Sequence, residues 1–101
     1  MADAVLSPRA DNELQSALEW IGADDADAAQ ALRDEVYRAS QRLGAHPRIG
    51  IIRTDLAPRP FRIVFLTGFP YVMVYDPRRT PPLIARIVHA ARDLPELLRE
   101  L

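Results

Sequence analysis

The sequence predicts an α+β fold: an N-terminal antiparallel helical hairpin packed on a small antiparallel sheet, with a short C-terminal helix. Residues 8–43 place apolar side chains at the 3.6-residue spacing of helices. Residues 61–89 instead hold short apolar runs, rich in β-branched and aromatic side chains, that glycine and proline separate. A chain of 101 residues, with 49% hydrophobic and 27% charged residues, is typical of one globular domain spanning residues 1–101.

The first helix is expected over residues 8–21. Ser7 is a favoured N-cap, and Pro8 suits the first helical position because its missing N–H would have no partner there. Gly22 is expected to end the helix in the left-handed conformation. Trp20 lies off the centre of the apolar stripe, so it either widens the core contact or stays exposed as an anchor for a partner. The stripe comprises Ala10, Leu14, Ala17, Leu18 and Ile21.

The second helix is expected over residues 24–43. Asp24, Asp25 and Asp27 suit the positive end of its dipole, and the sequence around them lacks the glycine and glutamate of a calcium-binding loop. Gly44 is expected to stop the helix. Only two or three residues join the two helices, so they should lie antiparallel and form one layer on a sheet. The apolar stripe of this helix comprises Leu32, Val36, Ala39 and Leu43.

Three consecutive strands linked by hairpins are expected within residues 61–89, and Val5–Leu6 is expected to add a brief edge strand. The first two runs, Phe61–Leu66 and Tyr71–Asp76, are largely apolar on both faces. The helical hairpin can cover only one face, which leaves the other to loops, a C-terminal element or a partner. Residues 49–55 are expected to form an irregular strand or an extended arm that leads into the sheet.

A last short helix is expected from Asp93, because Asp93 and Glu96 have the spacing of a capping box. Two turns of helix are marginal alone, so this helix must dock, either as a lid over one sheet edge or as an element exchanged with a partner. Leu97, Leu98 and the earlier Trp20 are therefore candidate partner-binding residues. The apolar positions of the helix are Leu94, Leu97, Leu98 and Leu101.

Composition and charge restrict the chemistry. The chain has no cysteine and only two histidines, so no metal site is expected, and no motif indicates a cofactor. All thirteen basic residues are arginine, which removes acid–base chemistry by lysine. The net charge is −1, but residues 1–41 carry three arginines against nine acidic residues, whereas residues 42–101 carry ten arginines against five. The basic half suits an acidic partner or phosphates.

The sequence gives no sign of a membrane-bound or exported protein. No window approaches the roughly 18 apolar residues of a membrane span, and the N-terminus lacks the basic and apolar regions of a signal peptide. A cytoplasmic protein is therefore expected.

One set of side chains could support catalysis: Arg62, Arg86, His89 and either Tyr71 or Tyr75. The arginines could stabilise a phosphodiester transition state while the histidine or a tyrosine moves protons, which is the minimum for RNA cleavage without a metal. The alternative interpretation is structural. In that case Arg86 and His89 are hydrogen-bonded strand residues, and the tyrosines fill the core or an interface.

Over residues 5–98 the sequence resembles the toxins of the RelE/ParE superfamily of bacterial toxin–antitoxin systems. The most specific block, Arg-Ile-Val-His-Ala-Ala-Arg-Asp-Leu, is similar to the arginine-aliphatic-aliphatic-histidine-x-x-arginine-aspartate signature of ParE-type members. The order of two helices, three strands and a short tail is also that of the family. The resemblance rests on Arg53–Leu56, Arg59–Arg62, Tyr71–Asp76 and Arg86–Leu94.

The resemblance implies a toxin that a small antitoxin, encoded beside it and ParD-like or similar, neutralises by wrapping its C-terminal segment around the toxin. ParE-type members are associated with poisoning DNA gyrase, and RelE-type members with cutting mRNA on the ribosome. RelE-type sites use lysine beside arginine and tyrosine, and this sequence has no lysine. The absence of lysine therefore favours a non-enzymatic toxin that binds gyrase. The alternatives are a RelE-type mRNA endonuclease and an inactive relative that still binds antitoxin.

The resemblance also extends the expectations about site and assembly. The candidates for the functional face are Arg62, Tyr75, Arg86, His89 and Arg92. A homodimer within a toxin–antitoxin hetero-oligomer is compatible with the family. Direct DNA binding by the toxin alone is not expected.

Overall fold

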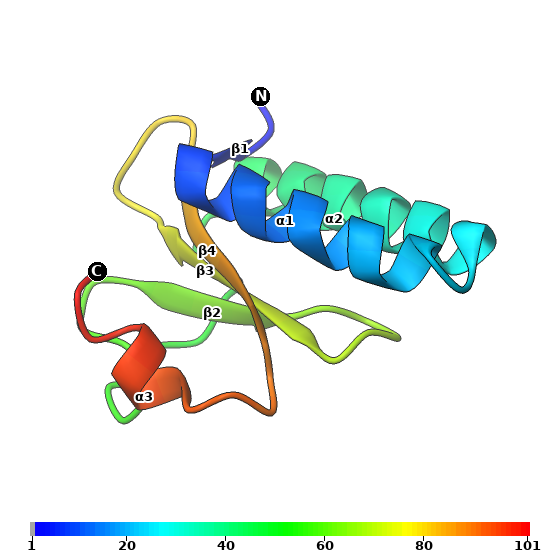
Figure 1. Cartoon of the computed structure of the whole chain (residues 1–101). Coiled ribbons are helices and arrows are strands. Elements are labelled where there is room, and N and C mark those ends of the chain that lie inside the picture. The colour runs from blue at the N-terminus through cyan, green and yellow to red at the C-terminus, as the bar shows by residue number, and fades with distance from the viewer. Residues whose placement is uncertain (1) are drawn as a thin grey trace.

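The computed structural model describes residues 2–101. In Figure 1 the hairpin of α1 and α2 covers one face of a four-stranded sheet, and α3 lies on the other side. The predicted α+β class is confirmed. The elements follow the order β1 (Val5–Leu6), α1 (Pro8–Gly22), α2 (Ala26–Ala45), β2 (Arg62–Phe65), β3 (Tyr71–Asp76), β4 (Leu83–His89) and α3 (Leu94–Leu97).

The first and last helices begin where they were predicted, whereas α2 begins at Ala26, two residues after its expected start, with Asp25 as its cap. The Ser7 hydroxyl accepts a hydrogen bond from the Ala10 N–H at 3.0 Å, and Asp25 accepts one from the Ala28 N–H at 3.0 Å. Asp93 likewise caps α3. Each cap satisfies a backbone donor that the first turn of a helix leaves without a partner.

Neither Gly22 nor Gly44 ends its helix in the expected left-handed conformation. Gly22 is still helical, and Ala23 follows it in a right-handed conformation with φ −60°. Gly44 lies inside α2, which continues to Ala45. A Cβ at Gly44 would collide with the backbone of Ala2, so this glycine serves close packing of the N-terminal segment against the helix.

The sheet has the strand order β1-β4-β3-β2 and is mixed. The predicted hairpins are present, since β2 pairs antiparallel with β3 and β3 with β4. The predicted edge strand β1 is also present, but it runs parallel to β4, with Val5 opposite Leu83 and Leu6 opposite Ile84. The expected all-antiparallel sheet is corrected at this one strand, because β1 meets a strand at the other end of the chain.

The sheet separates two apolar clusters. On the helical side Leu14, Leu18 and Leu32 pack against strand residues that include Met73 and Tyr75. On the other side, residues from the loop before β2 and from α3 cover the remaining face. This confirms that a C-terminal element helps to close that face. The second cluster comprises Ala57, Ile63, Val72, Val74, Val88, Leu94 and Leu98.

Asp76, at the end of β3, carries a pH-dependent part of the stability. Its carboxylate accepts hydrogen bonds from the backbone N–H, Nε and Nη2 of Arg78 at 2.9, 3.0 and 3.0 Å. Mainly through the Arg78 side chain, these bonds lower the pKa of Asp76 below its ordinary value, against the opposing effect of burial. A pKa that is lower in the folded than in the unfolded chain stabilises the fold above about pH 4, and this contribution is lost as the pH falls through the folded pKa.

We expect Asp76→Asn to lower the free energy of unfolding by about 1 kcal/mol at neutral pH, a modest loss because the Arg78 side chain is largely exposed. The difference between the variant and the wild type should shrink as the pH falls below about 4. Urea unfolding at neutral and acid pH measures both quantities. A difference that does not change with pH would contradict the assignment.

Candidate functional site

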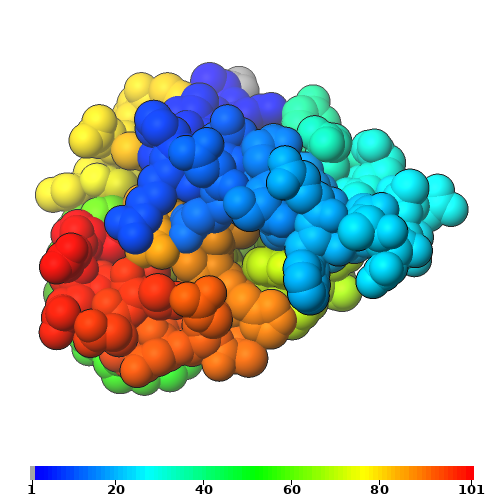
Figure 2. Space-filling view, in the orientation of Figure 1, coloured from blue at the N-terminus to red at the C-terminus, as the bar shows by residue number. Residues whose placement is uncertain are grey.

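A groove of about 540 Å³ lies between α1 and the C-terminal part of the chain. The second half of β4 and the residues that follow it form the wall opposite α1, and Figure 2 shows the two parts facing each other. Most of the predicted site residues line this groove. They are Trp20, Arg86, His89, Arg92 and Leu97.

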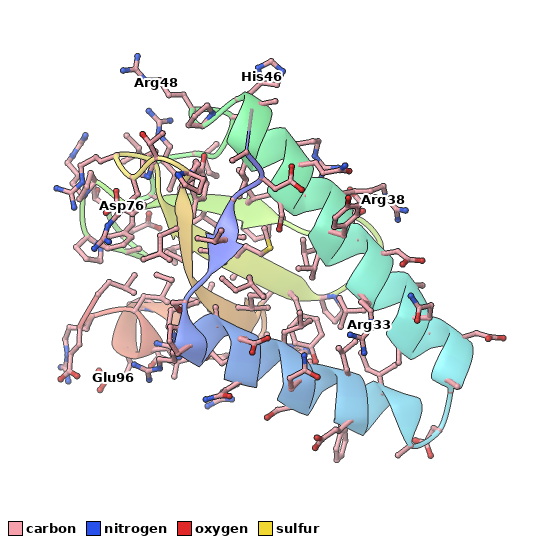
Figure 3. The ribbon with its side chains drawn as sticks, turned by 90° about the horizontal axis from the view of Figure 1, so that it is seen from above. Arg33, Arg38, His46, Arg48, Asp76 and Glu96 are labelled. Carbon is pink, nitrogen blue, oxygen red and sulfur yellow. The ribbon has the colours of Figure 1, made fainter. Side chains whose placement is uncertain are left out.

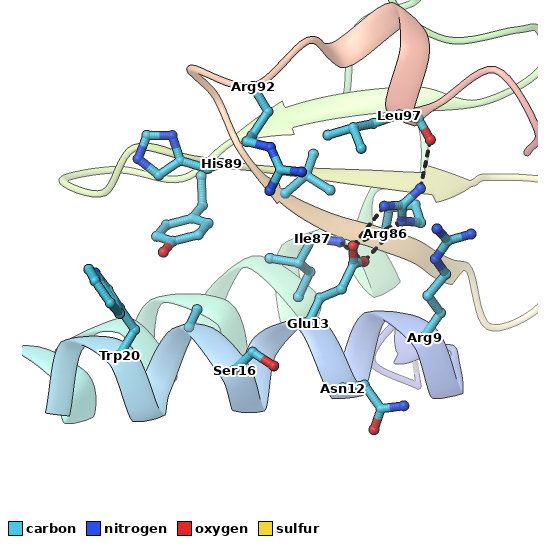
Figure 4. A pocket seen from close by; sticks show the side chains of 13 residues that line it. Arg9, Asn12, Glu13, Ser16, Trp20, Arg86, Ile87, His89, Arg92 and Leu97 are labelled. Atoms are coloured by element: carbon cyan, nitrogen blue, oxygen red, sulfur yellow. Dashed lines mark hydrogen bonds and ion pairs between the residues drawn. The ribbon is translucent and has the colours of Figure 1, made fainter. Parts of the chain in front are cut away.

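An ion pair between Arg86 and Glu13 forms the floor of the groove (Figure 4). Arg86 Nη2 lies 2.8 Å from Glu13 Oε2, and Arg86 Nε lies 3.0 Å from both carboxylate oxygens. Arg86 Nη1 donates to the carbonyl of Leu97 at 2.7 Å, and the Arg86 side chain is only 5% exposed. Arg86 therefore ties α1, β4 and α3 together and does not present its charge to solvent.

Glu13 also covers an open edge of the sheet. β1 pairs with β4 only as far as Ile84, so Ile87 lies beyond it on the same edge. The Ile87 N–H donates to Glu13 Oε1 at 3.0 Å. A helix carboxylate thus takes the place of a neighbouring strand, because a buried backbone donor without a partner would be costly.

The walls of the groove carry positive charge and aromatic surface. In Figure 4, Arg9 on α1 and Arg92 after β4 both extend into the groove. Among residues 2–101 neither of these arginines forms an ion pair. Trp20 is 80% exposed, which supports the anchor alternative and shows that the core alternative was wrong. The His89 ring packs edge-on to Tyr71, with centroids 5.2 Å apart.

Tyr75 and Arg62 belong to a different part of the molecule. The buried Tyr75 hydroxyl donates to the carbonyl of Pro47 at 2.6 Å and accepts from the Gly50 N–H at 2.9 Å. Arg62 Nη1 donates to the carbonyls of Gly50 and Arg48 at 2.9 and 3.3 Å. Burial raises the pKa of Tyr75, which keeps its proton on the oxygen. Both side chains hold the loop after α2.

The structure assembles only part of the catalytic set considered from the sequence, since Tyr71, Arg86 and His89 line the groove but Arg62 does not. Arg62 binds the loop after α2, whereas Arg86 is buried against Glu13 and α3. Tyr75 has no exposed surface and Arg86 is only 4% exposed, so neither presents its polar group to solvent. Leu98 is also fully buried, in the cluster beneath α3, and its side chain is not available to a partner.

Comparison with known proteins identifies the family. The family described as "ParE toxin of type II toxin-antitoxin system, parDE" matches residues 4–94. The chain belongs to this ParE toxin family. A solved structure described as "Chromosomal ParDE TA system from P. aeruginosa" has the same fold, with a TM-score of 0.72 and 16% identity, and the match covers 88% of this chain and 96% of that one. A search of curated proteins gave no match.

Sequence reasoning missed two residues of the groove in this ParE toxin. Neither Glu13 nor Arg9 belongs to the apolar stripe of the first helix, and no local signal in the sequence marked either of them. Glu13 and Arg86 are separated by 73 residues, so their pairing depends on how α1 crosses β4. A local signal was present only for Arg86, as a charged residue inside an apolar strand, which indicates a buried partner or a function.

The groove of this ParE toxin presents features that a binding partner could use. Within residues 2–101, no group of three or more His, Cys, Asp or Glu side chains is placed to hold a metal ion. The groove offers unpaired arginines and an exposed tryptophan. These features fit an extended acidic peptide with bulky apolar side chains.

None of the helices in the described part of the chain is long and apolar enough to cross a membrane.

Proposed function

We propose that this ParE toxin acts in the cytoplasm, inhibits DNA gyrase by binding it, and is neutralised by an antitoxin whose acidic segment occupies the groove beside α1. Membership of the ParE toxin family supports the proposal that the chain is a toxin. The cations Arg9 and Arg92 and the exposed Trp20 line the same groove, and they support the proposed antitoxin site because a carboxylate-rich peptide with apolar anchors complements them.

The burial of Arg86 is the observation that favours binding over RNA cleavage. A catalytic arginine must reach the phosphate whose charge develops in the transition state. Arg86 instead gives its donors to Glu13 and to the Leu97 carbonyl, and Arg62 is fixed on the loop after α2. Cleavage of RNA by Arg86, as in the RelE-type alternative, would require that Arg86 leave this ion pair. The second alternative, an inactive relative, would keep the groove but would not be toxic.

Induction of the chain with and without its neighbouring antitoxin gene tests the proposal. Expression alone should arrest growth and leave translated messages intact in primer extension. Co-expression of the antitoxin should restore growth. A chain that is harmless when expressed alone would contradict a toxin, and discrete cuts in translated messages would favour the endonuclease.

Charge reversal at the groove should weaken antitoxin binding. We expect Arg92→Glu to raise the Kd of the purified pair by about tenfold or more, because it replaces an exposed unpaired cation on the groove wall by an anion. Arg33→Glu is the matched control, since Arg33 is exposed on α2 and does not line the groove. Calorimetry measures both affinities. Equal effects of the two reversals would contradict a groove-bound antitoxin.

A further inference from the structure

A second surface, distant from the groove lining, displays isoleucine. Ile49, Ile51 and Ile52 occupy three of four successive positions in the loop after α2 and are 47%, 46% and 37% exposed. Burial of such a side chain is worth about 1.5 to 3 kcal/mol. A loop that leaves three of them about 40 to 50% exposed therefore forgoes part of this stability.

This loop is held in place by specific bonds. Ile51 and Ile63 exchange two backbone hydrogen bonds, at 3.0 and 2.8 Å, in a single antiparallel bridge. Tyr75 binds the Gly50 N–H and the Pro47 carbonyl, and Arg62 binds the carbonyls of Gly50 and Arg48. A Cβ at Gly50 would lie 2.6 Å from Cε1 of Tyr75, so the loop packs directly on the tyrosine ring. The isoleucines are exposed on a fixed backbone.

The surroundings of the isoleucines are basic. Arg48 is exposed, and Figure 3 shows it and His46 extending outward beyond the end of α2. The Arg62 guanidinium bonds to backbone carbonyls, and among residues 2–101 it forms no ion pair with a carboxylate. Arg53 is paired with Asp55 at 2.6 Å and adds little net charge. The surface therefore combines an apolar centre with a positive border.

We propose that the Ile49–Ile52 surface is the contact by which the toxin binds its protein target, at an apolar patch of that target bordered by carboxylates. An apolar centre with a charged border is the arrangement of protein interfaces. RNA would instead favour aromatic stacking surfaces and a continuous basic track. This inference rests on the proposed toxin function, and it places the target away from the groove given to the antitoxin.

A double substitution separates target binding from antitoxin binding. We expect Ile49→Ser/Ile52→Ser to abolish growth arrest on expression without antitoxin, while the Kd for the antitoxin stays within about threefold of the wild type. Retained antitoxin affinity also shows that the variant is folded. Tyr37→Ser is the matched control, because Tyr37 is 60% exposed on α2, and it should remain toxic.

The contrary outcomes are distinct. A double variant that still arrests growth would overturn the inference. A fall of about tenfold or more in its affinity for the antitoxin would also overturn it, since the surface would then belong to the antitoxin. The inference would likewise be overturned if the wild type shifts the mobility of single-stranded RNA and the double variant does not, because the surface would then bind nucleic acid. A harmless wild type would instead contradict the proposed toxin function itself.

Tyr75→Phe tests whether the loop must be held for target binding. The substitution removes the hydroxyl that binds the Gly50 N–H and the Pro47 carbonyl. We expect faster hydrogen exchange at the Gly50 amide, weaker toxicity and unchanged antitoxin affinity. Faster exchange with full toxicity would contradict the positioning role of Tyr75.

Discussion

Glu13→Ala is expected to lower the free energy of unfolding by about 3 kcal/mol, more than any surface substitution in this chain. The change leaves the Arg86 guanidinium buried without its counter-ion, and it leaves the Ile87 N–H without an acceptor. Both groups then lack the bonds that offset their removal from water. Urea denaturation followed by circular dichroism measures the effect.

Glu19→Ala is the control for Glu13→Ala. Glu19 is exposed on the same helix, and its replacement should change the free energy of unfolding by less than about 0.5 kcal/mol. Adding Arg86→Met to Glu13→Ala should recover part of the loss, because the charge that lost its partner is removed as well. Additive effects of the two substitutions would contradict a direct ion pair between Glu13 and Arg86.

Leu98→Ala is expected to cost about 2 to 5 kcal/mol, since Leu98 is fully buried beneath α3 and its truncation leaves a cavity. Its neighbour Leu97 is partly exposed at the groove, and only its backbone carbonyl bonds to Arg86. Leu97→Ala should therefore cost about 1 kcal/mol or less. The same urea titration compares the two, and equal losses would show that α3 is not docked through Leu98.

The parts of the fold that local chemistry decides were predicted from the sequence. Ser7, Asp25 and Asp93 each cap a helix, because a cap needs only the residues of the first turn. The periodicity of apolar residues likewise located both long helices and the hairpin strands. The errors at Gly22 and Gly44 have another origin. A glycine can stop a helix or allow close packing, and the difference depends on neighbours that are distant in the sequence.

The candidate site was predicted as a list of residues but not as an arrangement. Trp20, His89 and Arg92 do meet at one groove, and their polar or aromatic character at the edges of apolar segments was the signal. Arg86 and Tyr75 gave the same signal for another reason, since both are buried polar groups with distant partners. Sequence spacing cannot tell a charge that faces solvent from one paired 73 residues away.

The exposure of the isoleucines after α2 could not be predicted from the sequence pattern. Residues 49–55 were expected to lead into the sheet, and Ile51 does pair with Ile63. Ile49, Ile51 and Ile52 nevertheless remain exposed. What holds them there is the buried Tyr75 hydroxyl, which bonds to a backbone 25 residues earlier.

DNA cleavage by purified gyrase, in the presence of the purified toxin, tests the proposed function most directly. We expect the toxin to increase the amount of gyrase-linked cleaved DNA, and a stoichiometric amount of antitoxin to abolish the increase. Ile49→Ser/Ile52→Ser toxin should leave gyrase unaffected. Unchanged gyrase activity with toxin in excess, together with discrete cuts in ribosome-bound mRNA, would contradict inhibition by binding to gyrase.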